Sequence, residues 1–245
     1  MPSRRIVLLV ALVFAITLLV RLPARWAATL LPAGIECQDA TGTVWNGECA
    51  RLRAVGANLS RVGWQLLPAQ LLRGTLAANI RSSDPLANGN LQVRAGSGGR
   101  LELRDVNARV QLAGGLIPAL RDQWRGQIEL ALSRVELQSL QPRALAGNAR
   151  VIDLRQARPP LEFGSYELAF PPGLADNTDI VGALRDLQGP MGVTGTLRLR
   201  ATGEYELDGT VVARPTAGPE LQRLIEFLGP ANAQGARPFS LAGTL

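Results

Sequence analysis

Residues 193–211 read VTGTLRLRATGEYELDGTV, two runs of alternating apolar and polar residues on either side of a short turn. Alternation with a period of two is typical of a β-strand with one face in the core and one in water. If the central Ala-Thr-Gly forms a three-residue loop, Leu199 lies opposite Tyr205 on the apolar face. Arg198 then lies opposite Glu206 on the polar face, whereas a shift by one residue mixes the two faces. The stretch predicts an antiparallel hairpin in this register.

The same alternation continues upstream, but its phase changes at three places. The changes fall between Leu103 and Val106, between Leu132 and Val135, and between Phe163 and Tyr166. Each change requires a bulge or a bend, which suits a long sheet that curls. Regular alternation of strands and helices is missing, which argues against a parallel doubly wound sheet. We therefore expect a mainly β fold, a long, curved, mostly antiparallel sheet with a few short helices.

The best candidate for a helix in this β region is residues 220–228. Its apolar residues have helical spacing, Pro219 lies in the first turn and Gly229 follows the last residue. We expect its apolar stripe to seal the end of the sheet, the alternative being an exposed docking face. Shorter helical turns are expected at residues 68–72, 118–121 and 182–187. Turns are expected at Asn46-Gly47, at residues 88–90 and at residues 96–99, while Asp208-Gly209 lies inside a strand.

The N-terminus carries an apolar run, residues 6–20, with basic residues on both sides. Arg4 and Arg5 precede Ile6, and Arg21, Arg25 and Trp26 follow Val20. Fifteen helical residues rise about 22 Å, short of the roughly 30 Å hydrocarbon core, but snorkelling arginines and an interfacial tryptophan cover the deficit. The run predicts a single membrane-anchoring helix with the N-terminus in the cytoplasm.

The same apolar length also suits a secretory signal peptide. The small residues that a cleavage site requires are absent directly after Val20, which favours an uncleaved signal-anchor over a cleaved peptide. Both alternatives export everything after about residue 27. We therefore expect a cytoplasmic stub with its anchor, residues 1–27, and an exported β-rich domain, residues 28–245.

Composition argues against several classes of function. The chain has no histidine, which excludes Ser-His-Asp and Cys-His catalysis and histidine ligation of metals. We expect no catalytic, metal or cofactor site, and an enzyme that uses only carboxylates or arginines is the weakest alternative. Four of the 26 basic residues lie in residues 1–25, so the other 22 are nearly balanced by 20 acidic ones. A nucleic-acid partner is therefore not expected.

Two cysteines, Cys37 and Cys49, lie in the exported part of the chain. In an oxidising compartment a disulfide between them is the favoured interpretation. A free reactive pair is the alternative, but the Cys-x-x-Cys spacing of redox proteins is absent.

Three segments rich in glycine, tryptophan and leucine follow one another along the chain. Residues 41–47 read TGTVWNG and include Gly42, Thr43, Val44, Trp45 and Gly47. Residues 62–76 read VGWQLLPAQLLRGTL and include Trp64, Pro68, Leu71, Leu72 and Gly74. The tail, residues 235–245, reads GARPFSLAGTL and includes Leu241, Gly243 and Leu245. Both tryptophans are expected to pack within the domain rather than to contact a partner.

In this order, behind an apolar N-terminal segment, the three segments resemble those of protein N of the type II secretion system. The middle of the chain, residues 85–190, matches only in strand character. Ala236, which separates Gly235 from Arg237, and the cysteine pair depart from the family's pattern.

This resemblance implies a single-pass inner-membrane protein with a periplasmic β-rich domain. Such a protein is a component of the machine that exports folded proteins, and its implied partners are the inner-membrane platform proteins and the outer-membrane secretin. The family is also similar to AsmA-like domains, whose long sheets curl into an open apolar groove. Two functions follow as alternatives: an interaction protein that binds partners through its edge strands, or a lipid-handling protein with an acyl chain in the groove.

Overall fold

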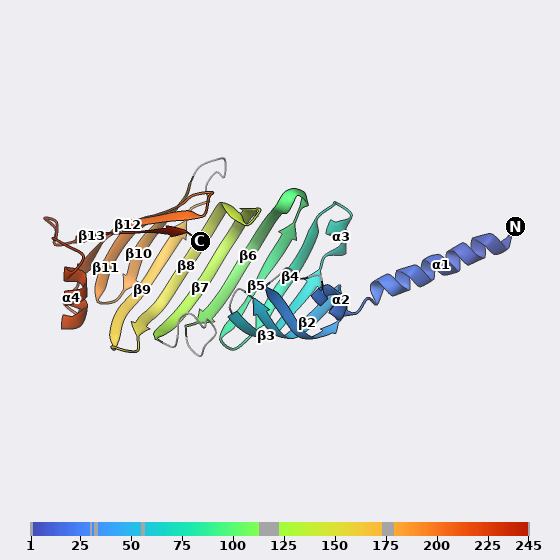
Figure 1. The fold of residues 1–245 in the computed structure, drawn as a ribbon, viewed down its shortest axis with the longest axis horizontal. Helices are drawn as coiled ribbons and strands as arrows, with labels where there is room; N and C mark the ends of the chain where they lie inside the picture. Colours follow the sequence, from blue (N-terminus) through green and yellow to red (C-terminus); the bar gives the residue numbers. More distant parts are fainter. Residues whose placement is uncertain are drawn as a thin grey trace.

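A long antiparallel sheet forms the body of the molecule (Figure 1). The computed structural model describes residues 2–29, 31, 34–54, 57–112, 123–172 and 179–244. Within them, thirteen strands pair in chain order, each antiparallel to the next. The strands are β1 (Ile35–Gly42), β2 (Asn46–Ala54), β3 (Ala57–Leu66), β4 (Leu76–Ser83), β5 (Ala87–Ala95), β6 (Arg100–Gln111), β7 (Trp124–Gln138), β8 (Gln141–Gln156), β9 (Leu161–Phe170), β10 (Ile180–Gln188), β11 (Met191–Leu199), β12 (Glu204–Ala213) and β13 (Arg237–Thr244). The predicted mainly β, antiparallel fold is confirmed.

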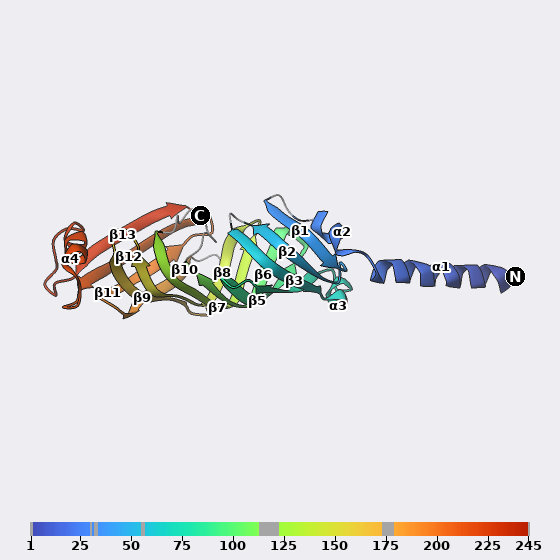
Figure 2. The same ribbon diagram turned by 90° about the horizontal axis from the view of Figure 1, so that it is seen from below.

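Four helices and one 3₁₀ turn accompany this sheet in the described part of the chain. They are α1 (Pro2–Val20), α2 (Ala24–Thr29), α3 (Pro68–Leu71), the 3₁₀ turn η1 (Ser97–Gly99) and α4 (Pro219–Glu226). α1 projects from the end that carries β1, with α2 and α3 beside it, and α4 lies at the opposite end (Figures 1 and 2). Among the described residues, no helix combines the length and the apolar character that crossing a bilayer requires. The predicted single-span anchor is therefore not confirmed.

The sheet curls along its length, and the outer strands fold over toward one another (Figure 2). Register shifts occur at all three predicted changes of phase. The shift between β5 and β6 lies opposite Asp105, whose φ is 50°. The shift between β7 and β8 follows Leu132, and the shift between β8 and β9 lies beside Gly164, whose φ is 100°. An extra residue at each position bends the strand, which lets a long sheet curve.

The hairpin of β11 and β12 has the predicted register. Leu199 pairs with Tyr205 and Arg198 with Glu206. The N–H of Gly203 donates to the carbonyl oxygen of Arg200 at 2.9 Å and closes the three-residue loop. Because both faces of these strands constrain the pairing, local pattern alone was enough to determine it.

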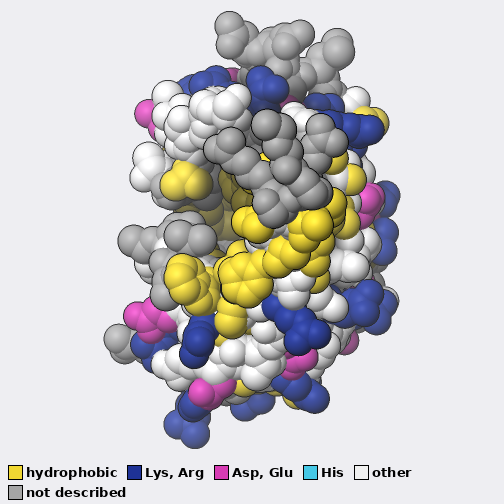
Figure 3. Space-filling view, turned by 90° about the vertical axis from the view of Figure 1, so that its right-hand side faces the viewer, with side chains coloured by type: hydrophobic (Ala, Val, Ile, Leu, Met, Phe, Trp, Pro, Cys, Tyr) yellow, Lys and Arg dark blue, Asp and Glu magenta, His cyan; other side chains and the backbone are white. Residues whose placement is uncertain are grey.

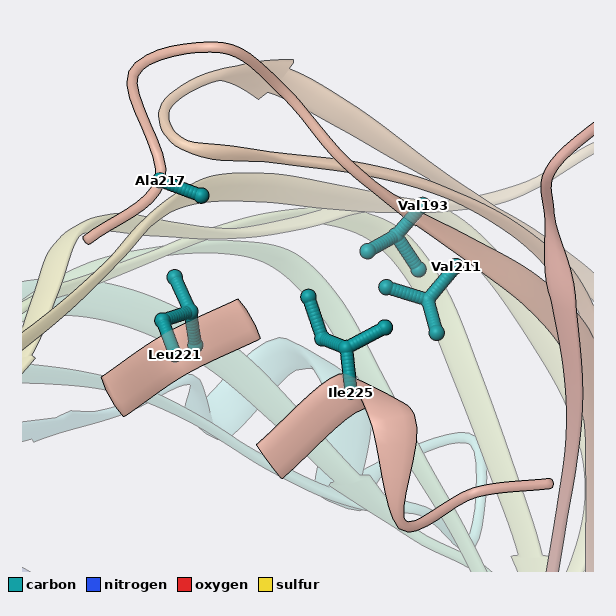
Figure 4. Close-up of a cluster of buried hydrophobic side chains, with 5 residues drawn as sticks. All are labelled: Val193, Val211, Ala217, Leu221 and Ile225. Atoms are coloured by element: carbon teal, nitrogen blue, oxygen red, sulfur yellow. The ribbon is translucent and has the colours of Figure 1, made fainter. Parts of the chain in front are cut away.

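A compact cluster of buried apolar side chains lies at the α4 end of the curled sheet. Leu221 and Ile225 of α4 pack against Val193 and Val211 on the inner face (Figure 4). Elsewhere the inner face carries apolar side chains in register across neighbouring strands, and these are half-buried. One such row consists of Leu130, Ala149, Leu168 and Leu184 on β7 to β10. The predicted stripe on α4 seals the sheet only in part, because Phe227 and Leu228 just beyond the helix are exposed.

Several local predictions are wrong, and neighbouring strands explain why. Asn46-Gly47 begins β2 instead of forming a turn, and the turn is made by residues 43–45. Residues 88–90 lie in β5; the turn before it is made by Asp84, whose carboxylate accepts from the N–H groups of Leu86 and Ala87.

Of the short helical turns, residues 68–71 are confirmed as α3, but residues 182–187 belong to β10. Gly182 is there because the ring of Phe170 packs over it, leaving no room for a Cβ. The prediction for residues 118–121 lies outside the described residues. The 3₁₀ turn η1 matches the turn expected at residues 96–99, and Asp208-Gly209 lies inside β12 as expected.

Candidate functional site at the α1 end of the sheet

The TGTVWNG segment joins the N-terminal helix to the sheet. The loop between β1 and β2 presents the indole Nε1–H of Trp45 to the carbonyl oxygen of Leu19 at 2.8 Å. That carbonyl belongs to the last turn of α1, and it also accepts from the N–H of Leu22 at 3.5 Å. The N–H of Val44 donates to the carbonyl of Leu22 at 2.9 Å, and Thr43 forms an isolated bridge with Pro23. We call residues 43–45, with their contacts to Leu19, Leu22 and Pro23, the clasp, because they hold the end of α1 and the residues after it against the sheet.

The glycines of this segment make room for the clasp. Gly42 adopts a φ of 87° and turns the chain out of β1. Gly47 pairs directly with Trp64 on β3, and a Cβ on Gly47 would lie 2.4 Å from Cζ2 of that indole. Trp64 in turn donates its Nε1–H to the carbonyl of Val44 at 2.9 Å. Both Trp45 and Trp64 are half-buried within this end of the domain.

A disulfide closes the strand pair beside the clasp. Cys37 on β1 and Cys49 on β2 are bonded, with their Cα atoms 5.8 Å apart, as predicted. Cys49 is fully buried and Cys37 is half-buried. The bond lies on β1, the first edge strand of the sheet, and holds that edge covalently.

The second motif builds α3 next to the clasp. The N–H of Leu66, at the end of β3, donates to the carbonyl of Trp45 at 2.8 Å. Pro68 starts the short helix, and Gly74 ends it with its N–H on the carbonyl of Leu71 at 3.0 Å. At the tip of this helical turn Leu72 is 91% exposed. The structure thus brings the first two motifs together at the α1 end.

The third motif lies on β13, the edge strand opposite β1 in the sheet. Gly243 pairs with Tyr205 of β12, and a Cβ on Gly243 would meet the Tyr205 ring at 2.7–2.9 Å. Leu241 pairs with Leu207 but is exposed by more than half. Leu245 lies outside the described residues. The described residues of this motif shape the last edge strand.

The predicted anchor residues lie on α1 and α2. The large apolar side chains from Ile6 to Val20 are 52–66% exposed, and Trp26 on α2 is similarly exposed. The side chains of Arg4 and Arg5 lie outside those described. α1 therefore presents an apolar surface that packs against nothing among the described residues except at its last turn.

A row of alternating charge across the outer face was missed from the sequence. It consists of Arg109, Glu129, Arg150, Glu167 and Arg185 on β6 to β10. Glu167 is 2% exposed because two arginines cover it; its carboxylate accepts from Nε of Arg150 and Nε of Arg185, each at 2.7 Å. These hydrogen bonds, first from Arg150 and then from Arg185, hold the pKa of Glu167 below its ordinary value. Only the register across five strands reveals the row.

A separate ion pair, between Asp186 and Arg214, lies on the inner face near α4. Burial raises the pKa of Asp186, but the N–H of Val193 and the guanidinium of Arg214 outweigh it and keep that pKa below its usual range. Burial also raises the pKa of the neighbouring Tyr166 to about 12. Each of these groups is engaged by structural partners. Across the described residues, no cluster of potential metal ligands is present.

Comparison with known proteins identifies the family. Residues 33–240 match the profile of "Type II secretion system (T2SS), protein N". The chain belongs to this family. It is 26% identical to the type II secretion system protein N of Aeromonas hydrophila over 239 residues, 93% of each chain. It is 27% identical to the Klebsiella pneumoniae protein over 250 residues, which cover 96% of this chain and 94% of the relative.

A further member of the family, from Vibrio cholerae, is 38% identical over 76 residues, 30% of each chain. No solved structure matches the chain significantly. The resemblance expected from the three motifs is confirmed, and the family's name makes its members components of the type II secretion system.

Proposed function

We propose that this chain is a non-enzymatic component of the type II secretion machinery, held in the inner membrane by α1, with its β domain in the periplasm. The observation that carries the proposal is the match to the protein N family over residues 33–240, combined with a molecule whose two ends differ. One end bears the apolar helix and its clasp, and the other bears an uncovered sheet edge beside an apolar helix face. This arrangement suits a tether at one end and a docking surface at the other.

The apolar surface of α1 supports insertion into a membrane. Nineteen helical residues rise about 28 Å, and every side chain from Ile6 to Val20 except that of Thr17 is apolar. Arg4 and Arg5 at its start favour a cytoplasmic N-terminus. The disulfide between Cys37 and Cys49 supports an oxidising compartment for the domain, as the periplasm provides.

The partner contact is placed at β13. Strand β1, the opposite edge, carries charged residues and the disulfide, and α2 packs against it. From Phe239 to Thr244, by contrast, β13 carries no charged residue. A bare edge strand exposes backbone donors and acceptors that pair readily with an added strand. We place the platform proteins or the secretin there, through strand addition to β13, with Phe227 and Leu224 as an apolar flank.

A pair of lysine substitutions tests this contact. Ala242 lies exposed on the outer face of β13, and Val181 lies exposed on the same face of the interior strand β10. A charge on an edge strand disfavours added strands, so Ala242→Lys should reduce both secretion and co-purification of machinery proteins, while Val181→Lys should reduce neither. Wild-type behaviour of Ala242→Lys would refute strand addition. If deletion of the gene leaves secretion of every substrate unchanged, and no machinery protein co-purifies, the component role itself is wrong.

A second candidate function is AsmA-like binding of a lipid on the inner face. One observation favours it: apolar residues such as Leu103, Val135 and Leu145 lie in register and are only half-buried. A bound acyl chain would complete their burial. Native mass spectrometry of the full chain, with extraction and analysis of lipid, tests the idea; stoichiometric lipid supports it and an empty protein argues against it.

A further inference from the structure

Leu72 is the most exposed large apolar side chain in the described part of the chain, at 91%. It follows Leu71 at the tip of α3, and Arg73 comes directly after it. Pro68 and Gly74 define the two ends of this turn, so the local structure holds the leucines outward. A pair of leucines at such a tip is unfavourable in water unless something covers them.

The tip lies at the end of the molecule from which α1 leaves. Leu66, two residues before Pro68, hydrogen-bonds to Trp45, which itself hydrogen-bonds to Leu19 of α1. Both ribbon views place α3 and α2 at this end (Figures 1 and 2). Seen from this end, hydrophobic side chains gather in the middle of the view and most charged ones lie toward the rim (Figure 3). A membrane that receives α1 therefore lies next to α3.

The two segments that contain α2 and α3 carry charges of one sign only. Residues 17–34 and 63–80 contain three arginines, Arg21, Arg25 and Arg73, and no aspartate or glutamate. Basic residues beside exposed apolar ones suit the interface of a membrane that contains anionic lipid. The exposed Trp26 on α2 is also a residue type that membrane interfaces favour.

We propose that the tip of α3, with Leu71, Leu72 and Arg73, is a second membrane contact that inserts into the interfacial region of the bilayer that holds α1. This inference rests on the proposed insertion of α1. One helix alone lets the domain rotate and tilt about its tether. Two attached points restrict that motion and orient the long sheet relative to the membrane, with the α4 end on the side away from it.

The test uses the full chain reconstituted into vesicles of phosphatidylcholine, with and without phosphatidylglycerol. One cysteine added by Leu72→Cys, Leu140→Cys or Val13→Cys carries an environment-sensitive fluorophore, while Cys37 and Cys49 stay bonded and unlabelled. Nitroxide lipids act as quenchers. Leu140 is the matched control because it is an equally apolar turn residue, 82% exposed, midway along the sheet between β7 and β8. We expect a blue shift and quenching at positions 13 and 72 and neither at position 140.

Anionic lipid should increase quenching at position 72. Arg73→Gln should reduce the ratio of inserted to free tip about fivefold in these vesicles, since one basic residue near an anionic surface has roughly that effect.

The possible failures are distinguishable. Quenching at position 13 with an aqueous probe at position 72 overturns the second contact and leaves the insertion of α1 intact. An aqueous probe at position 13 overturns the membrane proposal itself. A blue shift at position 72 without quenching by nitroxide lipid means that protein covers the tip, and also overturns this inference.

Discussion

The two ends of this molecule are built by different means. At the α1 end, a disulfide, two tryptophan hydrogen bonds and glycines that accept close neighbours hold β1 to β3 and the helix together. At the α4 end, a helix packs Leu221 and Ile225 into the curl of the sheet. The first end is held by a covalent bond and by hydrogen bonds, which suits the proposed tether. The second end carries the edge strand β13, which suits the proposed docking surface.

The apolar cluster at the α4 end gives the largest expected effect. Ile225→Ala removes a buried side chain and should lower the free energy of unfolding by about 3 kcal/mol. Leu224→Ala, one position away on the exposed side of α4, should cost less than about 1 kcal/mol. Urea unfolding measures both, and hydrogen exchange should lose protection first in β9 and β12, which contact α4. Equal losses for the two variants would mean that α4 does not seal the sheet.

Removing the disulfide should lower the free energy of unfolding by a similar amount, but the loss should be located at the α1 end. Replacing Cys37 and Cys49 by alanine frees a short loop in the unfolded chain and should cost about 3 kcal/mol or somewhat less. Hydrogen exchange should increase in β1 and β2 and stay unchanged in α4. Reductant should affect the wild type and not the double variant. Loss of protection at the α4 end would show that the two ends are not separately stabilised.

The same contrast explains what the sequence could and could not predict. The hairpin at residues 193–211 was predictable because each strand faces both core and water, which leaves one register. The turns predicted at Asn46-Gly47 and at residues 88–90 were wrong because the glycine in each is required by close contact with a neighbouring strand and not by a turn. Gly47 makes room for Trp64, and Gly89 for the backbone of β6. Such contacts join residues that are distant in the chain, and local pattern does not contain them.

The candidate site shows the same limit. The TGTVWNG segment could be recognised as a motif, but its role depends on a hydrogen bond from Trp45 to Leu19, 26 residues away. The charged row from Arg109 to Arg185 was missed because five strands must first be aligned.

A glycine pair at the clasp gives an intermediate effect. Gly47→Ala sets a Cβ against the Trp64 indole and two backbone oxygens, and should cost about 2 kcal/mol. Gly63→Ala is the matched control, because its Cβ would meet only the carbonyl oxygen of Gly47, at 3.7 Å. Tryptophan fluorescence should change for the first variant and not for the second, and urea unfolding gives the energies. If both variants behave alike, close packing of Trp64 is not what holds this end.

The smallest expected effect lies between the two ends, in the charged row on β6 to β10. The hydrogen bonds from Arg150 and Arg185 lower the pKa of Glu167 in the folded chain, so the unfolded chain binds its proton more readily. The resulting stability is fully present above the ordinary pKa of about 4.5 and is lost as the pH falls through the lower folded value. Both arginines are partly exposed, so solvent screening limits the contribution to about 1 kcal/mol.

Glu167→Gln keeps the shape of the side chain and removes its charge. Its unfolding free energy should lie below that of the wild type by a constant amount near neutral pH, and the gap should shrink as the pH falls below about 4.5. Glu226→Gln, at the exposed end of α4, should leave no such gap. Urea unfolding from pH 7 to pH 3 measures both. A gap for Glu167→Gln that persists unchanged at pH 3 would mean that the charge of Glu167 is not what stabilises the middle of the sheet.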